Sequence, residues 1–226
     1  MNYSLSGERL HVHLQFSVLP GYEADWACIQ ISLTDISARK KAEAYLEFLG
    51  KHDSLTRLRN RSFFTDELNR LEREAIHPLS VLMIDLNGLK VANDTRGHIV
   101  GDALLRRAGE VLNKAVEAPA CAARIGGDEF IVLLPGATEA DAAQMVENIE
   151  QLLALNNQFY PGLALSMSIG CATAMAPQRL EDLVQLADAR MYSTKAMFYG
   201  DAQSAIHPAP ARLLNTGLPS LAHEPQ

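Results

Sequence analysis

Apolar and polar positions alternate in two stretches near the start of the chain. The first is Leu10–Leu19 (LHVHLQFSVL) and the second is Trp26–Leu33 (WACIQISL). Alternation with a period of two is typical of a half-buried β-strand, and Pro20-Gly21 supplies turn residues between the stretches. The pattern therefore predicts a β-hairpin. Because a two-stranded hairpin is marginal in water, we expect this piece to belong to something larger.

A helix is predicted immediately after this hairpin. Asp35 or Ser37 can cap its first turn, and the helix extends to about Gly50. Its apolar residues recur on one face, namely Ala42, Tyr45, Leu46 and Leu49. That spacing suits either a short coiled-coil seam or a linker helix docked on another surface, and for so few turns we favour docking.

From Asp53 onward, predicted helices alternate with continuous apolar runs. Helices are expected at about 62–76, 101–116, 139–155 and 180–198, and strands at 79–86, 121–125, 130–134 and 164–172. This order predicts an α/β (α+β) domain with a central mixed sheet flanked by helices. Residues 201–226 are rich in Pro, Ala, Ser and His without periodicity, which indicates a disordered tail.

Composition narrows the function classes. The 226 residues carry a net charge of −7, which argues against a general binder of nucleic acid or anionic membranes, although a small anionic ligand remains possible. The cysteines, Cys28, Cys121 and Cys171, have no metal-type spacing and are expected to be reduced thiols. Neither a membrane-spanning run nor a signal-peptide pattern is present, so we expect a cytoplasmic protein.

The run Arg124–Phe130 (RIGGDEF) is the most informative stretch. It lies between two predicted strands, so Gly126-Gly127 is expected to form a two-residue hairpin turn with positive φ. The missing Cβ atoms would let a ligand approach the backbone. Asp128 and Glu129 follow at once and could hold a divalent cation. Taken alone, the run could also be a polar turn with two solvated carboxylates.

Asp85 could join these carboxylates. It ends the predicted strand at 79–86, and if that strand lies beside the hairpin, Asp85, Asp128 and Glu129 converge. Three carboxylates at one place repel each other unless cations lie between them, and oxygen ligands favour Mg²⁺ or Mn²⁺. The alternative is that Asp85 caps the following helix.

Residues after Asp85 suit a nucleotide. Gly88 and Lys90 lie in a strand-to-helix turn whose amides and ammonium could bind phosphate, although Lys90 could equally be a solvated lysine. Asn93 and Asp102 could together bind a purine edge, because an amide donates and accepts while a carboxylate accepts from guanine. Asp102 could instead be a helix N-cap.

Taken in order, these motifs resemble the GGDEF diguanylate cyclase family over about residues 51–200. The motifs that carry the resemblance are Asp53-Ser54-Leu55-Thr56, Leu58-Arg59-Asn60-Arg61, Asp85, Lys90, Asn93-Asp94, Gly97-His98, Gly101-Asp102, Arg124–Phe130, Ser168-Ile169-Gly170, Ala187-Asp188, Met191-Tyr192 and Lys195. The resemblance implies a palm-like domain related in plan to nucleotidyl cyclases. It also implies condensation of two GTP into cyclic di-GMP by a homodimer of half-sites.

The resemblance assigns a role to each candidate residue. Two Mg²⁺ or Mn²⁺ ions per active site would be held by Asp85, the Leu86 carbonyl and Glu129, with Asp128 sharing the metal or assisting deprotonation of the hydroxyl. Substrate would be bound by Lys90, Lys195, Asn93, Asp102, Gly126 and Gly127.

The N-terminal part resembles the end of a PAS sensor domain. Asp35–Glu43 matches the segment by which many such domains pass into a linker helix. This predicts a partial PAS-like hairpin over 1–37, a linker helix over 38–50, the GGDEF domain over 51–200 and a tail over 201–226. A complete sensor pocket cannot be built from these strands, and an upstream sensor domain is an expected partner missing from this chain.

Several positions depart from the family pattern. Gly88-Leu89 replaces frequent Phe residues, Asn87 replaces a frequent Asp, and Arg57 stands where Gly is usual and is expected to be a surface change. Phe198-Tyr199 replaces a common Gly-Arg, so one phosphate contact is lost. Glu117 and Ala120 occupy the places of an inhibitory Arg-x-x-Asp site. These departures leave a weak or inactive GTP-binding, dimerising regulatory module as the alternative function.

Overall fold

The structure is a computed structural model that describes residues 2, 3, 7, 9–21, 23, 24 and 26–199. Its strands are β1 (Asn2–Tyr3), β2 (Arg9–Leu10), β3 (Val12–Val18), β4 (Ile29–Asp35), β5 (Leu79–Leu86), β6 (Cys121–Arg124), β7 (Glu129–Pro135) and β8 (Met167–Ala174). Its helices are α1 (Ser37–Lys51), α2 (Arg61–Glu74), α3 (Leu89–Arg96), α4 (His98–Ala115), α5 (Glu139–Phe159) and α6 (Leu180–Tyr199). The predicted tail at 201–226 lies outside the described residues.

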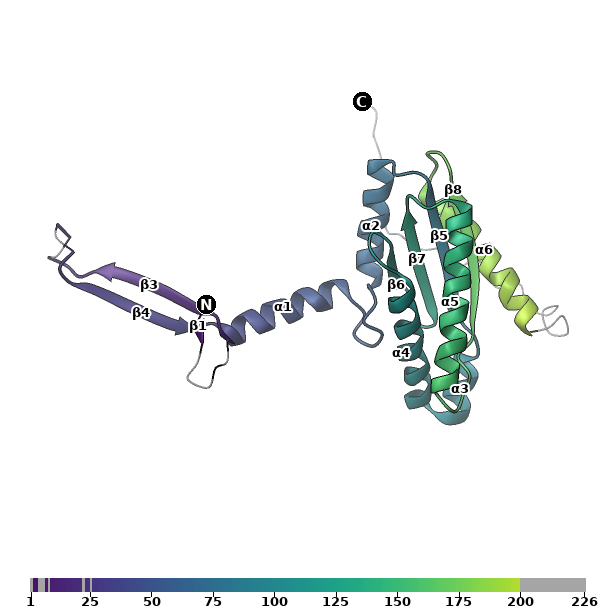
Figure 1. The fold of residues 1–226 in the computed structure, drawn as a ribbon, viewed down its shortest axis with the longest axis horizontal. Helices are drawn as coiled ribbons and strands as arrows, with labels where there is room; N and C mark the ends of the chain where they lie inside the picture. Colours follow the sequence, from purple (N-terminus) through teal and green to yellow (C-terminus); the bar gives the residue numbers. More distant parts are fainter. Residues whose placement is uncertain (1, 4–6, 8, 22, 25, 200–226) are drawn as a thin grey trace, which may run out of the picture.

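The predicted N-terminal hairpin is confirmed, but it is not half-buried. Strands β3 and β4 pair antiparallel, with Leu14 opposite Leu33 and Phe16 opposite Ile31. These four side chains are 59–70% exposed. Opposite residues of an antiparallel pair point to the same face, so the ribbon has one apolar face. Figure 1 shows the ribbon and α1 projecting away from the rest of the chain.

Helix α1 forms where the sequence predicts it, but it is not docked by its apolar face. Tyr45 and Leu46 are more than half exposed. By backbone geometry the N-cap is Ile36, while the Asp35 carboxylate accepts a hydrogen bond from Ser37 N–H at 2.8 Å. In this structure the apolar face of α1 is exposed, so the expected docking of this linker helix is wrong.

A four-stranded sheet with the order β6-β7-β5-β8 forms the centre of the larger domain. The predicted α/β class is confirmed, but the sheet is not mixed, because its described strands all pair antiparallel. The parallel element is a single bridge from Arg59 to Ala123 beside the edge strand β6. A short loop joins β6 to its antiparallel neighbour β7. The longer connection from β7 through α5 leads to β8, which pairs antiparallel with β5.

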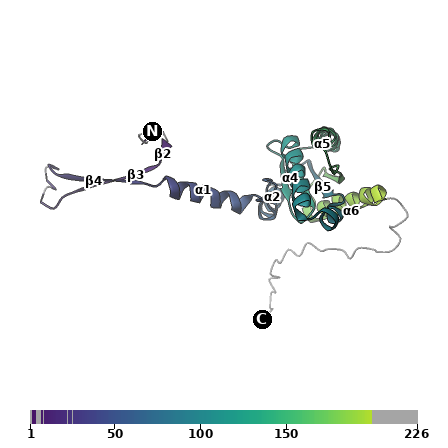
Figure 2. The same cartoon turned by 90° about the horizontal axis from the view of Figure 1, so that it is seen from below.

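Helices cover both faces of this sheet (Figure 2). On one face, Ile84, Phe130 and Val132 pack with α4 and α5, through residues such as Leu112 and Ile149. On the other face, side chains of the same strands pack with Phe64 and Leu71 of α2 and Leu183, Val184 and Met191 of α6. Because both faces are covered, β5 is buried along its whole length, as its continuous apolar run predicts.

The connection after β5 contains more helix than expected. The sequence predicts a strand-to-helix turn followed by a polar connection, whereas Leu89–Arg96 forms the two-turn helix α3. Gly88 precedes it with φ +74°, a conformation that glycine adopts at little cost.

Among the described residues, no helix combines the length and apolar character needed to cross a lipid bilayer.

Candidate active site

Two of the predicted acidic residues lie opposite each other on neighbouring strands. Asp85 on β5 is directly opposite Glu129 on β7, and opposite Ser168 on β8. Leu86 N–H donates a hydrogen bond to the Asp128 carbonyl at 3.0 Å, which fixes the hairpin loop to the end of β5. Asp85 is buried, while Asp128 and Glu129 are half-buried. The alternative of Asp85 as a helix cap is wrong, because Gly88 is the N-cap of α3.

The Gly-Gly loop differs from the predicted turn. Regular pairing of β6 with β7 ends at Arg124 and Phe130, so the loop is longer than two residues, and neither glycine has the expected positive φ. Gly126 makes room for the Glu129 carboxylate, which would have to move if a Cβ were present. Gly127 is exposed, with open space around its Cα. The first glycine therefore lets Glu129 fold back against the loop.

Arg124 holds this loop from behind. Its guanidinium donates to the Gly126 carbonyl at 3.1 Å and to the Gly127 carbonyl at 2.8 Å. It also contacts the Asp53 carboxylate at 3.2 Å. Asp53 in turn accepts two hydrogen bonds from Thr56 at 2.8 Å, one from the backbone and one from the hydroxyl. The sequence analysis assigns no site role to Arg124 or Asp53, although both lie within the motifs quoted there.

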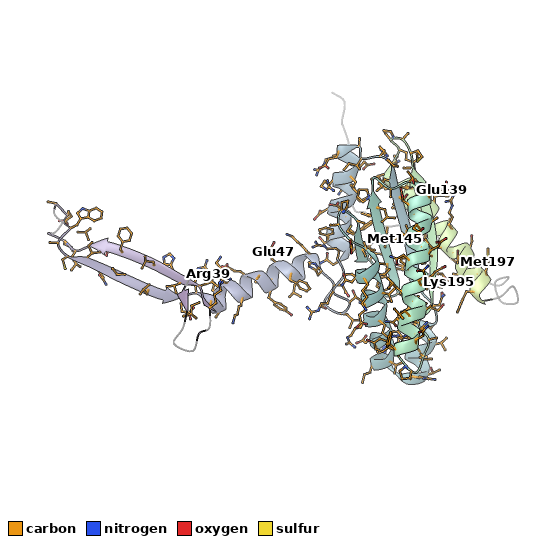
Figure 3. The ribbon with its side chains drawn as sticks, viewed as in Figure 1. Arg39, Glu47, Glu139, Met145, Lys195 and Met197 are labelled. Carbon is orange, nitrogen blue, oxygen red and sulfur yellow. The ribbon has the colours of Figure 1, made fainter. Side chains whose placement is uncertain are left out.

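Lys195 reaches the carboxylates from α6. Its Nζ lies 2.7 Å from Asp85 Oδ1. Figure 3 shows Lys195 on the helix beside the sheet. This approach depends on Gly170 of β8, where a Cβ would collide with backbone atoms of Ala187 and Met191 on α6. A glycine at that position lets the helix pack directly on the edge strand.

The electrostatics of Asp85 reflect this environment. The pKa of Asp85 is raised to about 6, mainly by burial and also by the negative charges of Asp128 and Glu129, while the Lys195 ammonium acts in the opposite direction. A carboxylate that resists ionisation in a cluster of like charges gains most from a nearby cation. Asp128 and Glu129 are thus near enough to Asp85 to affect its ionisation, and a shared metal site for the three carboxylates stays a prediction.

The proposed purine-binding residues lie on neighbouring helices. The Asn93 side chain of α3 contacts Gly101 of α4 so closely that a Cβ at Gly101 would overlap its amide. Asp102 follows Gly101 and is half-exposed, with Arg106 Nη2 3.8 Å from its carboxylate. Asp102 lies inside α4, which begins at His98, so its alternative role as an N-cap is wrong. Lys90 is exposed on α3, and no described contact joins it to the carboxylates.

Asn87 is buried behind the site. Its backbone N–H donates to the Ser166 carbonyl at 2.9 Å, its Nδ2 donates to Ser166 Oγ at 3.0 Å, and its Oδ1 accepts from Ser168 Oγ at 2.9 Å. These bonds fix the exit of β5 to the start of β8. The Asn87 side chain is therefore committed to holding these two strands together.

The donor set suits a hard divalent cation. Asp85 Oδ1 is buried beside the Lys195 ammonium, and the ligand atoms that its neighbours Asp128 and Glu129 could offer a metal are carboxylate oxygens. In the described part of the chain, no three His, Cys, Asp or Glu side chains are close enough to hold a metal ion as they stand. The oxygens thus fit Mg²⁺ or Mn²⁺ in kind, with the ammonium of Lys195 beside the most buried one.

Comparison with known proteins gives one consistent result. Residues 50–198 match the family described as "Diguanylate cyclase, GGDEF domain". The chain is 36% identical over 169 residues to the bifunctional diguanylate cyclase/cyclic di-GMP phosphodiesterase MucR of Pseudomonas aeruginosa, covering 72% of this chain and 25% of that protein. It is 37% identical over 153 residues to the diguanylate cyclase DosC of Escherichia coli, covering 63% and 32%.

A solved structure shares the fold. The coiled coil and GGDEF domain of DgcB from Caulobacter crescentus, in complex with c-di-GMP, superposes with a TM-score of 0.64 at 26% identity. The match covers 71% of this chain and 88% of that one. The chain spans only about a quarter to a third of the length of the two curated relatives above.

Proposed function

This chain belongs to the diguanylate cyclase family of GGDEF domains, and we propose that it condenses two GTP molecules into one cyclic di-GMP with release of two pyrophosphates. The observation that carries the proposal is the register of Asp85 with Glu129, beside Lys195, at one end of the sheet. The GGDEF domain proposed for this reaction covers residues 51–200, with a PAS-like hairpin and a linker helix before it.

The metal ligands in this proposal are Asp85, the Leu86 carbonyl, Asp128 and Glu129, and they would hold two Mg²⁺ or Mn²⁺ ions. When bound, such ions lower the pKa of the attacking hydroxyl and neutralise charge on the phosphate. The residues themselves provide a rigid frame, because Arg124 and the Leu86 amide fix the loop that carries two of the carboxylates. Asp128 is at the loop exit, where it could accept the proton of the hydroxyl.

Substrate orientation is assigned to the remaining residues. Asn93 and Asp102 would bind the guanine edge, while Lys90 and Lys195 would bind phosphate oxygens. Gly126 and Gly127 would let the nucleotide lie against the backbone, and the open space at Gly127 supports that role. Positioning and charge neutralisation can supply most of the rate enhancement of phosphoryl transfer.

The reaction requires two copies of the chain. Each domain would hold one GTP, and the 3′-hydroxyl of each nucleotide would attack the α-phosphate of the other. A homodimer of half-sites is therefore part of the proposal. Product inhibition through an Arg-x-x-Asp site is not expected, because Glu117 and Ala120 stand at its two positions.

The test is incubation of the protein with GTP and Mg²⁺, followed by mass-resolved chromatography of the products. Wild type should form cyclic di-GMP, Asp128→Ala should form none, and Asp66→Asn should match wild type because Asp66 is exposed on α2. A cyclic di-GMP titration of the active enzyme should give no tight non-competitive inhibition. Absence of product over a wide protein concentration range would contradict the cyclase proposal.

A GTP-binding, dimerising regulatory module is the second candidate. It is favoured by Phe198-Tyr199, which replaces a common Gly-Arg of the family and so loses one phosphate contact; Phe198 is 55% exposed. Measurable GTP binding without product formation would support this candidate.

A further inference from the structure

A buried arginine joins the two helices that cover one face of the sheet. Arg107 of α4 is 7% exposed, and Figure 1 shows α4 beside α5. Its guanidinium donates three hydrogen bonds to neutral oxygens, from Nε to Asn156 Oδ1 at 2.8 Å, from Nη2 to Asn157 Oδ1 at 2.7 Å and from Nη1 to the Leu163 carbonyl at 2.8 Å. Arg107 therefore ties α4 to the end of α5 and to the connection that follows α5.

This guanidinium is buried without a counter-charge in contact. In the part of the chain that the structure describes, no carboxylate lies within ion-pair distance of Arg107, and its guanidinium lies 4.8 Å from the centre of the Tyr160 ring. A buried charge without a counter-charge costs free energy. A planar guanidinium can, however, bond acceptors on separate segments in one fixed geometry. The contribution of Arg107 is therefore the geometry of its three bonds.

Asn157 continues this link toward the sheet. Its Oδ1 also accepts a hydrogen bond from Leu165 N–H at 2.7 Å, and its Nδ2 donates to the Leu165 carbonyl at 2.8 Å. A side-chain amide can donate and accept at once, so it holds both backbone groups of the buried Leu165. Within the described chain, the side chain of the neighbouring Asn156 bonds only Arg107. The link to the sheet therefore passes through Asn157 and not through Asn156.

The next residue reaches the strand that carries the buried carboxylate. Ser166 follows Leu165, and its carbonyl and hydroxyl oxygens accept hydrogen bonds from Asn87 at 2.9 Å and 3.0 Å. Asn87 lies two residues beyond Asp85, immediately after β5. Hydrogen bonds thus join α4 to α5, α5 to the segment before β8, and that segment to the exit of β5.

The other end of the link is the helix proposed to bind guanine. Asp102 lies five residues before Arg107 on α4, which is roughly 7.5 Å along the helix axis. The Asp102 side chain is 48% exposed, whereas Arg107 is buried. Helix α4 therefore presents the guanine ligand to solvent and is anchored on its buried side to the carboxylate strand.

We propose that Arg107, acting through Asn157, is a positioning residue that sets the distance between the guanine-binding helix α4 and the carboxylates at the end of β5. This inference rests on the guanine role of Asp102 in the proposed function. A nucleotide has to reach the base site and the carboxylates at the same time, and a misplacement of about 1 Å can cost about a hundredfold in rate. Loss of the link should weaken guanine nucleotides more than adenine nucleotides, because only guanine donates to the Asp102 carboxylate.

The test compares analogues of GTP and ATP in which a methylene group joins the α- and β-phosphates, so that no pyrophosphate is released. Calorimetry on the full chain with Mg²⁺ gives the two dissociation constants. Arg107→Met keeps an apolar stem and removes the donors, and it should lower the preference for the guanine analogue by about tenfold or more. Arg107→Lys keeps the charge but cannot make the three bonds, so it should show the same loss.

Two neighbouring asparagines provide a matched pair of variants. Asn157→Ala breaks the link to Leu165 and should reduce the preference, whereas Asn156→Ala removes an Arg107 acceptor of the same type outside the link and should keep it. Leu71→Ala opens a cavity under α2, on the other face of the sheet, and should also keep it. Partial unfolding weakens both analogues by the same factor, so the preference reports position and not stability.

An unchanged preference in Arg107→Met and Asn157→Ala would show a purely structural role and overturn the inference. Wild-type preference in Arg107→Lys would also overturn it, because the charge alone would then suffice, as would equal effects of Asn156→Ala and Asn157→Ala. A wild type without guanine preference would contradict it too. Failure of the cyclase proposal is recognised separately, by the absence of cyclic di-GMP from GTP, and leaves these binding ratios readable.

Discussion

Lys195 Nζ lies 2.7 Å from Asp85 Oδ1, so a lysine of the last helix pairs with the most buried carboxylate of the candidate site. The two residues are on different elements, α6 and β5, and their contact requires α6 to pack closely on β8. The ammonium offsets part of the charge of three neighbouring carboxylates. The same lysine is proposed to bind phosphate, so its position links the charge of the site to substrate binding.

Stability should depend on pH through Asp85. Its pKa is about 6 in the folded protein against 3.8 for the unperturbed group, so the folded state binds more protons between these values. The free energy of unfolding therefore falls as the pH rises from about 4 to 6, by at most about 3 kcal/mol. We expect Asp85→Asn to be more stable than wild type at pH 7 and equal to it near pH 4.

Urea unfolding in EDTA from pH 4 to pH 8 measures this effect. Added Mg²⁺ should then stabilise wild type and leave Asp85→Asn unaffected, because only the wild type keeps the buried carboxylate ligand. A stability difference that is constant across the pH range would show that Asp85 ionisation is not its cause.

Gly170→Ala should damage both stability and catalysis. A Cβ at this position meets the backbone of α6, which cannot move aside as a side chain can, so we expect a loss of about 1–3 kcal/mol. Lys195 lies one turn beyond Met191 and would be displaced with the helix. Urea unfolding and a GTP turnover assay measure the two effects. Gly50→Ala in α1, where a Cβ meets open space, is the control and should be neutral or slightly stabilising.

Arg124→Gln should loosen the catalytic loop. The change removes charge-assisted hydrogen bonds to two loop carbonyls and leaves the half-buried Asp53 without its guanidinium, which should cost about 1.5–3 kcal/mol. We expect kcat for GTP to fall more than KM changes, because the loop carries Asp128 and Glu129. Arg70→Gln removes a half-exposed, ion-paired arginine from α2 and should change stability by about 1 kcal/mol or less. Equal effects of both variants on kcat would contradict the role of Arg124.

Asp102→Ser should relax base selection. The carboxylate of Asp102 is half-exposed and only loosely paired with Arg106, so it can accept hydrogen bonds from a guanine. Loss of that acceptor should reduce the ratio of kcat/KM for GTP over ATP at least tenfold. Arg106→Gln serves as the control for the ion pair alone. An unchanged ratio in Asp102→Ser would exclude Asp102 from guanine binding.

Removal of residues 1–36 should leave the catalytic domain folded. The β3–β4 ribbon exposes an apolar face and projects away from the sheet (Figure 1), so it contributes little to the domain core. We expect the melting temperature of the domain to change by less than about 2 °C, and non-specific association to decrease. A large drop in melting temperature would show that the ribbon packs on the domain in solution.

Local patterns along the sequence predict most of the secondary structure. The strand at Leu79–Leu86 is found with the predicted bounds, because a continuous apolar run of that length is typical of a strand buried on both faces. Helix α3 is largely missed, because its eight residues are polar on one side and follow a glycine that favours a turn. The exposure of Phe16 and Leu46 is also not predicted, because the spacing of apolar residues indicates an apolar face but not whether another element covers that face.

Residue types at short separations are enough to predict the family, the order of the helices and strands, and the acidic run Asp128-Glu129. The contacts between distant residues become visible in the folded chain. It joined Arg124 to Asp53 across 71 positions and placed Lys195 beside Asp85. It also replaced the expected positive φ at Gly126 by a close approach of Glu129. Such contacts depend on the packing distance between elements, and no periodicity along the chain encodes that distance.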